Sequence, residues 1–247
     1  MKLALLSDLH ANRQATEAVW AHACRQGFDR LVMLGDYVDY GADPAWTVDF
    51  ARARQQEGAV VLQGNHDEAA AGEGNHGLSE HVLPSLRWTR EALSTEQRQW
   101  LGALPLSEQL DQCLAVHANA RHPEEWAYVQ GRVEAIDSLQ ATPCQYVVCG
   151  HMHEQALYHL TMTGKTGAFQ PTSGVTIPLS AARRWLAVAG SVGQPRDGNP
   201  AAAYAMLDMT QGSITFFRIP YDHDTAARRI EQAGLPAFFA QRLRDGQ

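Results

Sequence analysis

The feature that most constrains this chain is a pattern repeated five times, in which a short apolar run ends abruptly in His, Asp or Asn. The runs lie at 3–6, 31–34, 59–62, 113–116 and 145–149, and such polar side chains follow each of them within a few residues. Runs of this length are typical of buried β-strands, whereas the polar residues that follow are not suited to burial. We therefore expect the ends of these strands to meet around one polar site.

Helices are predicted between the first three strands. Residues 13–26 place small apolar side chains on one helical face and end at Gly27, and Asp43-Pro44 begins a second helix that ends at Gly58. A series of strand, helix, strand, helix and strand indicates a mainly parallel sheet with helices packed on it. In open α/β sheets ligands bind at the carboxyl ends of the strands, which is where the polar motifs lie.

The second half of the chain has a different pattern. Short strands separated by turn signals are predicted at 155–163, 174–179, 185–189, 202–209 and 213–220, and this part should be largely antiparallel. Further helices are predicted after Ser94, at 132–140, at 224–233 and at 236–244. The segment 68–85 has no clear period and is predicted to be a loop with weak helical content, in which His76 and His81 are candidates to line the site.

Composition limits the classes of function. A chain of 247 residues is most simply one domain, residues 1–247, and a net charge of −7 argues against a nucleic-acid duplex as partner, although a small anionic substrate stays open. The first six residues predict a strand and not a signal peptide, and no apolar run is long enough to span a membrane. Four cysteines without a C-x-x-C pair indicate reduced thiols and hence a cytoplasmic protein, while the oligomeric state stays open.

The strand ends together supply seven candidate metal ligands with nitrogen or oxygen donors and no thiolate: Asp8, His10, Asp36, Asn65, His117, His151 and His153. Such a set suits manganese, iron, zinc or cobalt. Seven ligands are too many for one tetrahedral ion, and they suit two ions ~3.5–4 Å apart that share a carboxylate and a water. Asp36 is the candidate for the shared carboxylate because its strand should be central in the sheet.

In this order the motifs resemble those of the calcineurin-like metallophosphoesterase superfamily. They are Asp8-x-His10, Gly35-Asp36-x-x-Asp39, Gly64-Asn65-His66-Asp67, His117 and Gly150-His151-x-His153, and the likeness extends beyond residue 200. The resemblance implies an α/β (α+β) fold in which two mixed β-sheets form a sandwich flanked by helices. It also implies that the first metal takes Asp8, His10, Asp36 and His153, and the second Asp36, Asn65, His117 and His151.

The resemblance implies roles for four further positions. His66 would donate a proton to the leaving oxygen or, with Asn65, hold the phosphate, and Asp39 would orient His66 and keep it charged. Residues 190–198 and 220–222 resemble a bacterial subgroup of small phosphodiesterases and dinucleoside-tetraphosphatase-like proteins. In that subgroup Arg196 is the candidate phosphate clamp, because a guanidinium group matches phosphate geometry. The alternative is that Arg196 pairs with Asp197 or Asp222 on the surface.

Three positions depart from the superfamily pattern. Tyr40 stands where protein serine/threonine phosphatases have a phosphate-binding Arg, which argues against that activity. Ala11 and Ala118 stand where Gly usually follows the histidine, so a methyl group at a tight turn would shift the backbone slightly.

The expected function is hydrolysis of a phosphodiester or phosphoanhydride in a small nucleotide-like substrate by a water activated between two divalent or mixed-valence metal ions. Manganese is the first choice of metal, and diadenosine tetraphosphate is the most concrete substrate. Trp126 and Tyr128, which follow His117, are candidate neighbours of an adenine. The alternatives are a broad phosphodiesterase or phosphomonoesterase, a protein phosphatase, and a scaffold that has lost catalysis.

Overall fold

Residues 2–61 alternate strands and helices, as predicted, and three helices follow in succession. The computed structural model describes residues 1–72 and 78–247. The elements are β1 (Lys2–Leu6), α1 (Arg13–Gln26), β2 (Arg30–Met33), α2 (Pro44–Gln56), β3 (Val60–Val61), α3 (Asn65–Ala71), α4 (Leu83–Ala92) and α5 (Thr95–Gly102). Gly27 ends α1 with a positive φ, and a capping box between Ser94 and Gln97 begins α5.

The second half is mostly strand. It consists of β4 (Ser107–Leu110), β5 (Cys113–Val116), a 3₁₀ turn at Pro123–Glu125, α6 (Arg132–Gln140), β6 (Tyr146–Cys149), β7 (Gln155–Thr161), β8 (Thr166–Phe169), β9 (Thr176–Pro178), β10 (Arg183–Ala189), β11 (Ala202–Asp208), β12 (Ser213–Ile219), α7 (His223–Gln232) and α8 (Ala237–Asp245). The turn at Gln211-Gly212 joins β11 to β12.

The strands form two six-stranded sheets with the orders β3-β2-β1-β11-β12-β9 and β4-β5-β6-β10-β7-β8. The first sheet is mixed, because β1, β2 and β3 are parallel and β11 pairs with β1 in antiparallel register. The second sheet is also mixed, because β5 and β6 are parallel whereas β7 and β8 are antiparallel. Consequently the carboxyl ends of β1, β2 and β3 lie at one edge, and those of β5 and β6 lie at the corresponding edge of the second sheet.

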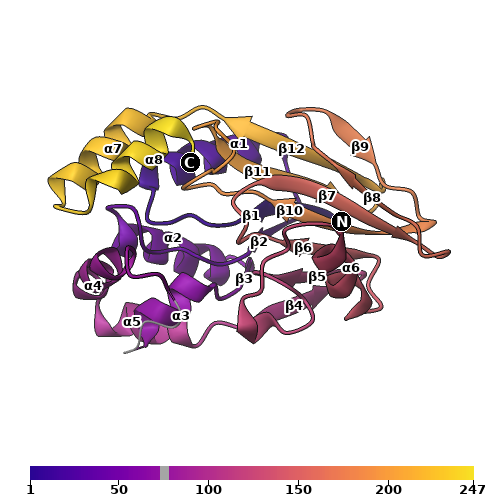
Figure 1. Ribbon diagram of the computed structural model, residues 1–247, viewed down its shortest axis with the longest axis horizontal. Helices are drawn as coiled ribbons and strands as arrows, with labels where there is room; N and C mark the ends of the chain where they lie inside the picture. Colours follow the sequence, from indigo (N-terminus) through magenta and orange to yellow (C-terminus); the bar gives the residue numbers. More distant parts are fainter. Residues whose placement is uncertain (73–77) are drawn as a thin grey trace.

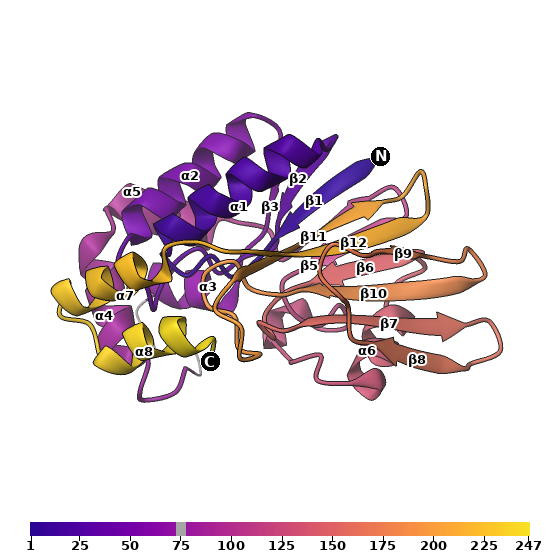
Figure 2. The same ribbon diagram turned by 90° about the horizontal axis from the view of Figure 1, so that it is seen from above.

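Helices cover the outer faces of the two sheets (Figures 1 and 2). Apolar side chains fill the space between the sheets. Leu5, Val32, Trp185 and Phe216 belong to the core shared by the sheets. The outer face of the first sheet packs against α1 and α2, and that of the second sheet packs against α6. The predicted α/β sandwich flanked by helices is confirmed.

The C-terminal helices α7 and α8 pack on each other and lie at one end of the molecule, beside the helical half (Figure 1). Their apolar face, which includes Ile230, Phe239 and Leu243, encloses the side chain of Tyr40. A segment far along the sequence therefore covers the loop that follows β2.

Sequence reasoning missed parts of the helical and strand content. The segment 68–85 is more helical than predicted, because α3 begins at Asn65 and runs through three alanines, and α4 begins at Leu83. Strands β4 and β8 were not predicted. Both lie at a sheet edge and carry polar or exposed residues, so neither shows a buried strand pattern.

Candidate metal centre

The seven predicted ligands are brought together where the strands of both sheets end. Each is at most 7% exposed: Asp8, His10, Asp36, Asn65, His117, His151 and His153. They form two groups whose donor atoms lie close enough for a metal ion, Asp8 with His10 and His153, and Asp36 with His117 and His151. Because buried polar groups are normally paired, this set of donors requires an explanation.

The first group consists of acceptors that face one another. Nδ1 of His10 lies 3.0 Å from the carbonyl oxygen of Val38, and Nδ1 of His153 lies 2.6 Å from that of Gln194. Each Nδ1 therefore carries the hydrogen, which leaves a lone pair on each Nε2. These two Nε2 atoms are only 3.1 Å apart, and Nε2 of His153 is 3.2 Å from Oδ1 of Asp8. Lone pairs at this separation repel unless a cation lies among them.

The second group has the same character. Nδ1 of His117 donates to the carbonyl oxygen of Leu34 at 2.8 Å, so Nε2 is the nitrogen that is left to bind a metal once it has lost its proton. This Nε2 lies 3.2 Å from Nδ1 of His151 and 3.3 Å from Oδ1 of Asn65. Two imidazole nitrogens and an amide oxygen are thus directed at one point, as in sites for metals that accept nitrogen and oxygen ligands.

Asp36 lies between the two groups. Its Oδ2 is 3.7 Å from Nε2 of His10 in the first group and 3.3 Å from Nε2 of His117 in the second. Its Oδ1 accepts the backbone N–H of His66 at 2.9 Å, and Oδ2 is buried without a hydrogen bond from any described residue. A carboxylate held by one oxygen, with the other directed at both groups, fits two cations that share Asp36.

Burial keeps three of the histidines neutral, as metal ligands must be. Desolvation lowers the pKa of His10, of His153 and of His151, the last to about 3. The free oxygen of Asp8, Oδ1, likewise has no hydrogen bond among the described residues, while its Oδ2 accepts the backbone N–H of His151 at 3.1 Å. The protonation states of these three histidines therefore fit metal ligands, as does their geometry, whereas Asp36 raises the pKa of His117, which must lose a proton to bind a metal.

The backbone that carries the ligands is strained. Asp8, His10, Asp36, His151 and His153 all have left-handed φ angles between 45° and 65°. This conformation costs a non-glycine residue roughly 1–2 kcal/mol, and such strain concentrates at functional sites. Gly64 permits the close approach, because a Cβ there would lie 2.1 Å from Oδ1 of Asp36.

Asp67 organises the site, although sequence reasoning assigned it no role. Its Oδ2 accepts the backbone N–H groups of Asp36 and Gly64, at 2.7 and 2.9 Å, and its Oδ1 accepts that of Tyr37 at 2.9 Å. It therefore joins the loop after β2 to the start of α3. The sequence did contain a signal for this role. Asp67 is the third residue of a helix that follows a glycine, and a glycine has no side chain to cap the helix. An acidic side chain at the third position can accept the backbone N–H of the residue before the helix.

His66 stands beside the metal ligands with both ring nitrogens engaged. Nδ1 is 2.8 Å from Oδ2 of Asp39, and Nε2 is 3.0 Å from the hydroxyl of Tyr40. Ser85 donates to the other oxygen of Asp39. Burial would lower the pKa of His66, but the charge of Asp36 and the hydrogen bond that His66 donates to Asp39 outweigh burial and raise this pKa above its usual value. The surroundings of His66 therefore favour its protonated form.

Arg196 lies at the first group and not in a surface ion pair. Its guanidinium group is 5.8 Å from the ring centre of Tyr40 and donates to Oε1 of Gln194 at 3.1 Å. After burial, the charge of Arg196 is the next cause of the lowered pKa of His153. The alternative partners are engaged elsewhere, since Asp197 pairs with Arg218 and Asp222 caps α7. Within residues 1–72 and 78–247, no carboxylate pairs with Arg196.

A comparison with protein families agrees with this geometry. A model of the calcineurin-like phosphoesterase superfamily domain matches residues 1–212 of the chain. The chain belongs to this superfamily. The resemblance found in the sequence and the prediction of a metal-dependent phosphoesterase are thereby confirmed.

Similar proteins match along their whole length. The crystal structure of a metallophosphoesterase from Sphaerobacter thermophilus is 30% identical, with 100% of this chain and 99% of that chain covered and a TM-score of 0.86. An uncharacterized protein of Methanocaldococcus jannaschii is 29% identical, covering 98% of this chain and 96% of its own. A hypothetical protein from Pyrococcus horikoshii shares the fold at 17% identity, with a TM-score of 0.79 and coverage of 100% and 98%.

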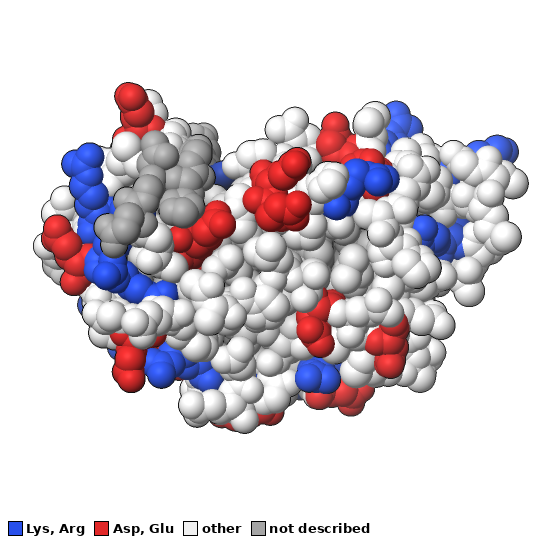
Figure 3. Space-filling view, turned by 90° about the horizontal axis from the view of Figure 1, so that it is seen from below, with Lys and Arg blue, Asp and Glu red and all other residues white. Residues whose placement is uncertain are grey.

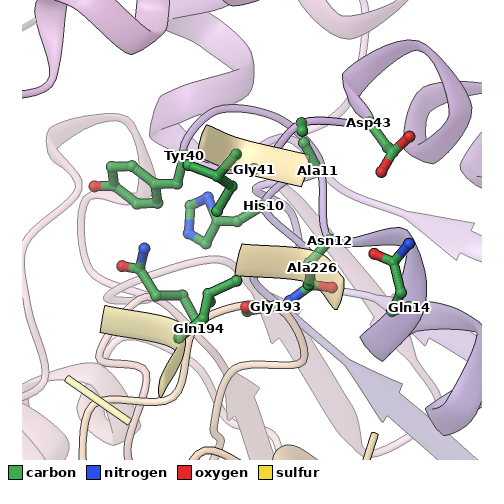
Figure 4. Close-up of a pocket in the computed structure, with 13 residues that line it drawn as sticks. His10, Ala11, Asn12, Gln14, Tyr40, Gly41, Asp43, Gly193, Gln194 and Ala226 are labelled. Carbon is green, nitrogen blue, oxygen red and sulfur yellow. Dashed lines mark hydrogen bonds between the residues drawn. The ribbon is translucent and has the colours of Figure 1, made fainter. Parts of the chain in front are cut away.

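Two pockets border the metal centre of this phosphoesterase. The larger, of about 370 Å³, is lined by Asn65, His66, Trp126, Tyr128 and His151, among others. The smaller lies between His10, Tyr40 and Gln194 on one side and helices α7 and α8 on the other, and Figure 4 shows these three side chains beside one another.

The remaining predictions concern the rest of the phosphoesterase. His81 is exposed and does not line the larger pocket, and His76 lies outside the described residues. On the face shown in Figure 3, the described acidic and basic side chains are interspersed, without a broad basic patch.

No helix of the described chain is both long and apolar enough to cross a membrane. Cys113, Cys144 and Cys149 are buried free thiols, and Cys24 is exposed.

Proposed function

We propose that this phosphoesterase hydrolyses a phosphodiester or phosphoanhydride bond of a small nucleotide-like substrate with water. The observation that carries the proposal is the position of Asp36, whose Oδ2 has no hydrogen bond among the described residues and lies 3.7 Å from Nε2 of His10 and 3.3 Å from Nε2 of His117. When bound, two cations that share this carboxylate supply a hydroxide near neutral pH and neutralise the oxygens of the phosphoryl group.

We assign the ligands as the sequence suggested. Asp8, His10, Asp36 and His153 hold the first ion, and Asp36, Asn65, His117 and His151 hold the second. The orphaned oxygens of Asp8 and Asp36 and the facing imidazole nitrogens support this assignment. Manganese is our first choice, with iron, zinc and cobalt as alternatives, because the ligands mix imidazoles with carboxylate and amide oxygens.

His66 and Asp39 carry the proton transfer in this proposal. The raised pKa of His66 keeps a proton on Nε2, and the hydrogen bond from Nδ1 to Asp39 fixes the orientation of the ring. A leaving oxygen that reaches Nε2 takes this proton and replaces the Tyr40 hydroxyl as its partner. Proton donation matters most for an alkoxide and less for a nucleotide, which is already a good leaving group.

Arg196, Asn65 and His66 bind the phosphate in this proposal. A partly buried guanidinium group without a carboxylate partner among the described residues costs free energy unless an anion joins it. Asn65 and His66 lie at the start of α3, beside the second group of ligands. The bound phosphate would thus meet positive charge from Arg196 and hydrogen-bond donors from His66.

The substrate that we consider first is diadenosine tetraphosphate, and a broad phosphodiesterase or phosphomonoesterase is the alternative. A protein serine/threonine phosphatase is disfavoured, because Tyr40 occupies the position of the phosphate-binding Arg and contacts His66. A scaffold without catalysis is disfavoured most, because all seven ligands and His66 are present and converge.

We also propose that residues 1–247 act as one domain in the cytoplasm and bind no nucleic-acid duplex. The core shared by both sheets supports a single domain. The free thiols support a location in the cytoplasm, and the net charge of −7 argues against a nucleic-acid duplex as partner.

A substrate panel tests the function. Metal-stripped protein is resupplied with Mn, Fe(II), Co, Zn or Mg and offered diadenosine tetraphosphate, cyclic nucleotides, p-nitrophenyl phosphate and its bis-ester. Release of ATP and AMP from the tetraphosphate supports the nucleotide substrate, whereas turnover of the artificial diester alone favours the broad phosphodiesterase. Tight metal binding without any turnover would overturn the proposal.

A further inference from the structure

Tyr128 presents an open aromatic face at the metal centre. Its ring stacks on the imidazole of His151, with centroids 4.1 Å apart and an interplanar angle of 15°. One face of the phenol ring is therefore covered by a proposed metal ligand, yet Tyr128 is still 44% exposed and lines the larger pocket. Large exposed aromatic residues at a concave site are typical of ligand contacts and not of a core.

Trp126 forms a second wall of the same pocket. Its ring meets His117 edge to face, with centroids 5.7 Å apart, and its indole N–H donates to Oε2 of Glu68 at 2.9 Å. The backbone of Trp126 is left-handed, with φ 54° and ψ 32°. A bulky residue in this conformation costs roughly 1–2 kcal/mol, so the loop holds the indole in place at the expense of stability.

The two aromatic residues give the centre two chemically different ends. Both contact histidines of the second group, His117 and His151. Arg196 contacts Tyr40 and acts on His153, which belongs to the first group. An anion is therefore favoured at one end and a flat apolar ring at the other, while a phosphoryl group would lie between them.

We propose that Tyr128 and Trp126 form a subsite that binds the nucleobase of the substrate by stacking. The inference rests on the proposed function and adds the part of the substrate that the metal ligands do not contact. Stacking uses the π-face that every base has, so the subsite accepts different bases. The indole N–H of Trp126 is already bonded to Glu68 and is not free to read the edge of a base.

A simpler role for Tyr128 makes a different prediction. If the tyrosine only supports the ring of His151, its removal weakens metal binding and affects every substrate alike. If it binds a base, its removal affects only ligands that carry a base. The decisive quantity is therefore a ratio of affinities between two ligands that differ in the base alone.

AMP and ribose 5-phosphate form such a pair. Their dissociation constants are measured by calorimetry on manganese-loaded wild-type protein, with metal content determined in parallel. We expect AMP to bind about tenfold more tightly than ribose 5-phosphate, which corresponds to about 1.4 kcal/mol of stacking. In Tyr128→Leu the ratio should fall towards one, and Tyr128→Phe should retain it.

Phe169→Leu provides the matched control, because Phe169 is a 43% exposed aromatic residue on β8 that does not line the pocket. This variant should keep the wild-type ratio. Equal affinity of wild-type protein for the two ligands would overturn the subsite, as would a Tyr128→Leu protein that loses metal and binds both ligands proportionally less well.

The failure of this inference is distinguishable from that of the proposed function. Methyl p-nitrophenyl phosphate carries no base, so its hydrolysis reports on the metal centre alone. If wild-type protein hydrolyses this diester but shows no preference for AMP, the subsite is wrong and the phosphodiesterase activity stands. If it hydrolyses no phosphoester, the proposed function itself is wrong.

Discussion

The hydroxyl of Tyr40 lies 3.0 Å from Nε2 of His66, the nitrogen from which a leaving group would take its proton. The opposite nitrogen is fixed by Asp39 at 2.8 Å, so the ring cannot turn to present Nε2 elsewhere without losing that bond. A tyrosine hydroxyl both donates and accepts, and it therefore satisfies this nitrogen until an oxygen of the substrate replaces it. The imidazole ring of His66 is thus held in one orientation before substrate binds.

His66→Ala should slow the hydrolysis of an alkyl phosphodiester by ~10²–10⁴, because proton donation to the leaving oxygen is lost. Metal content should not change, since His66 is not among the assigned ligands. The measurement is kcat together with metal analysis of the purified variant, using a p-nitrophenyl diester as the control substrate that needs little acid catalysis. An unchanged rate on the alkyl ester would remove His66 from the mechanism.

Asp36→Asn should reduce the metal content of the protein. An amide oxygen carries no negative charge, so the variant loses the carboxylate whose Oδ2 faces both His10 and His117. Metal analysis after dialysis measures the effect, with Asp49→Asn, at an exposed position on α2, as the control. Full occupancy of both ions in the Asp36 variant would contradict a shared carboxylate.

Metal affinity should rise with pH up to about 9. Burial lowers the pKa of His117, but Asp36 outweighs burial and raises it to about 9, so the metal-free protein carries a proton there at neutral pH. A metal must displace that proton, and binding at pH 7 should release it. Calorimetric titrations in buffers of different ionisation enthalpy detect the release, and a binding heat that is independent of the buffer would refute it.

The same shift makes the metal-free protein less stable at alkaline pH. The folded pKa of His117 lies above its ordinary value of 6.5, so its contribution is complete below about 6.5 and is lost as pH rises to about 9. Denaturant unfolding of the metal-free protein across this range measures the loss.

Ala11→Gly should be tolerated better than Ala118→Gly. Both alanines are 1% exposed, so both substitutions lose a buried methyl group and increase the freedom of the unfolded chain. Only Ala11 is left-handed, at φ 51°, and glycine relieves a strain of roughly 1–2 kcal/mol there. The free energies of unfolding of the two variants should differ by about this amount, and equal values would show that Ala11 is not strained.

The sequence by itself determined the strands of the βαβ half, the helices around them and the identity of the candidate metal ligands. Strands β1 and β2 and helix α1 are specified locally, because apolar periodicity, glycine stops and caps act over a few residues. The clustering of the ligands was also predictable, since parallel strands place their carboxyl ends at one edge of a sheet.

Only the tertiary structure decided how those residues meet. Nε2 of His10 lies 3.1 Å from Nε2 of His153, 143 residues further along, and no local pattern specifies such a contact. The sequence left two roles open for Arg196, and the pairing of Asp197 with Arg218 across the fold takes away one of the surface partners that it could have had. The contact of Tyr40 with His66 and the stacking of Tyr128 on His151 have the same origin. Side-chain contacts between distant segments depend on how the sheets and loops pack, whereas helix and strand formation depends mainly on near neighbours.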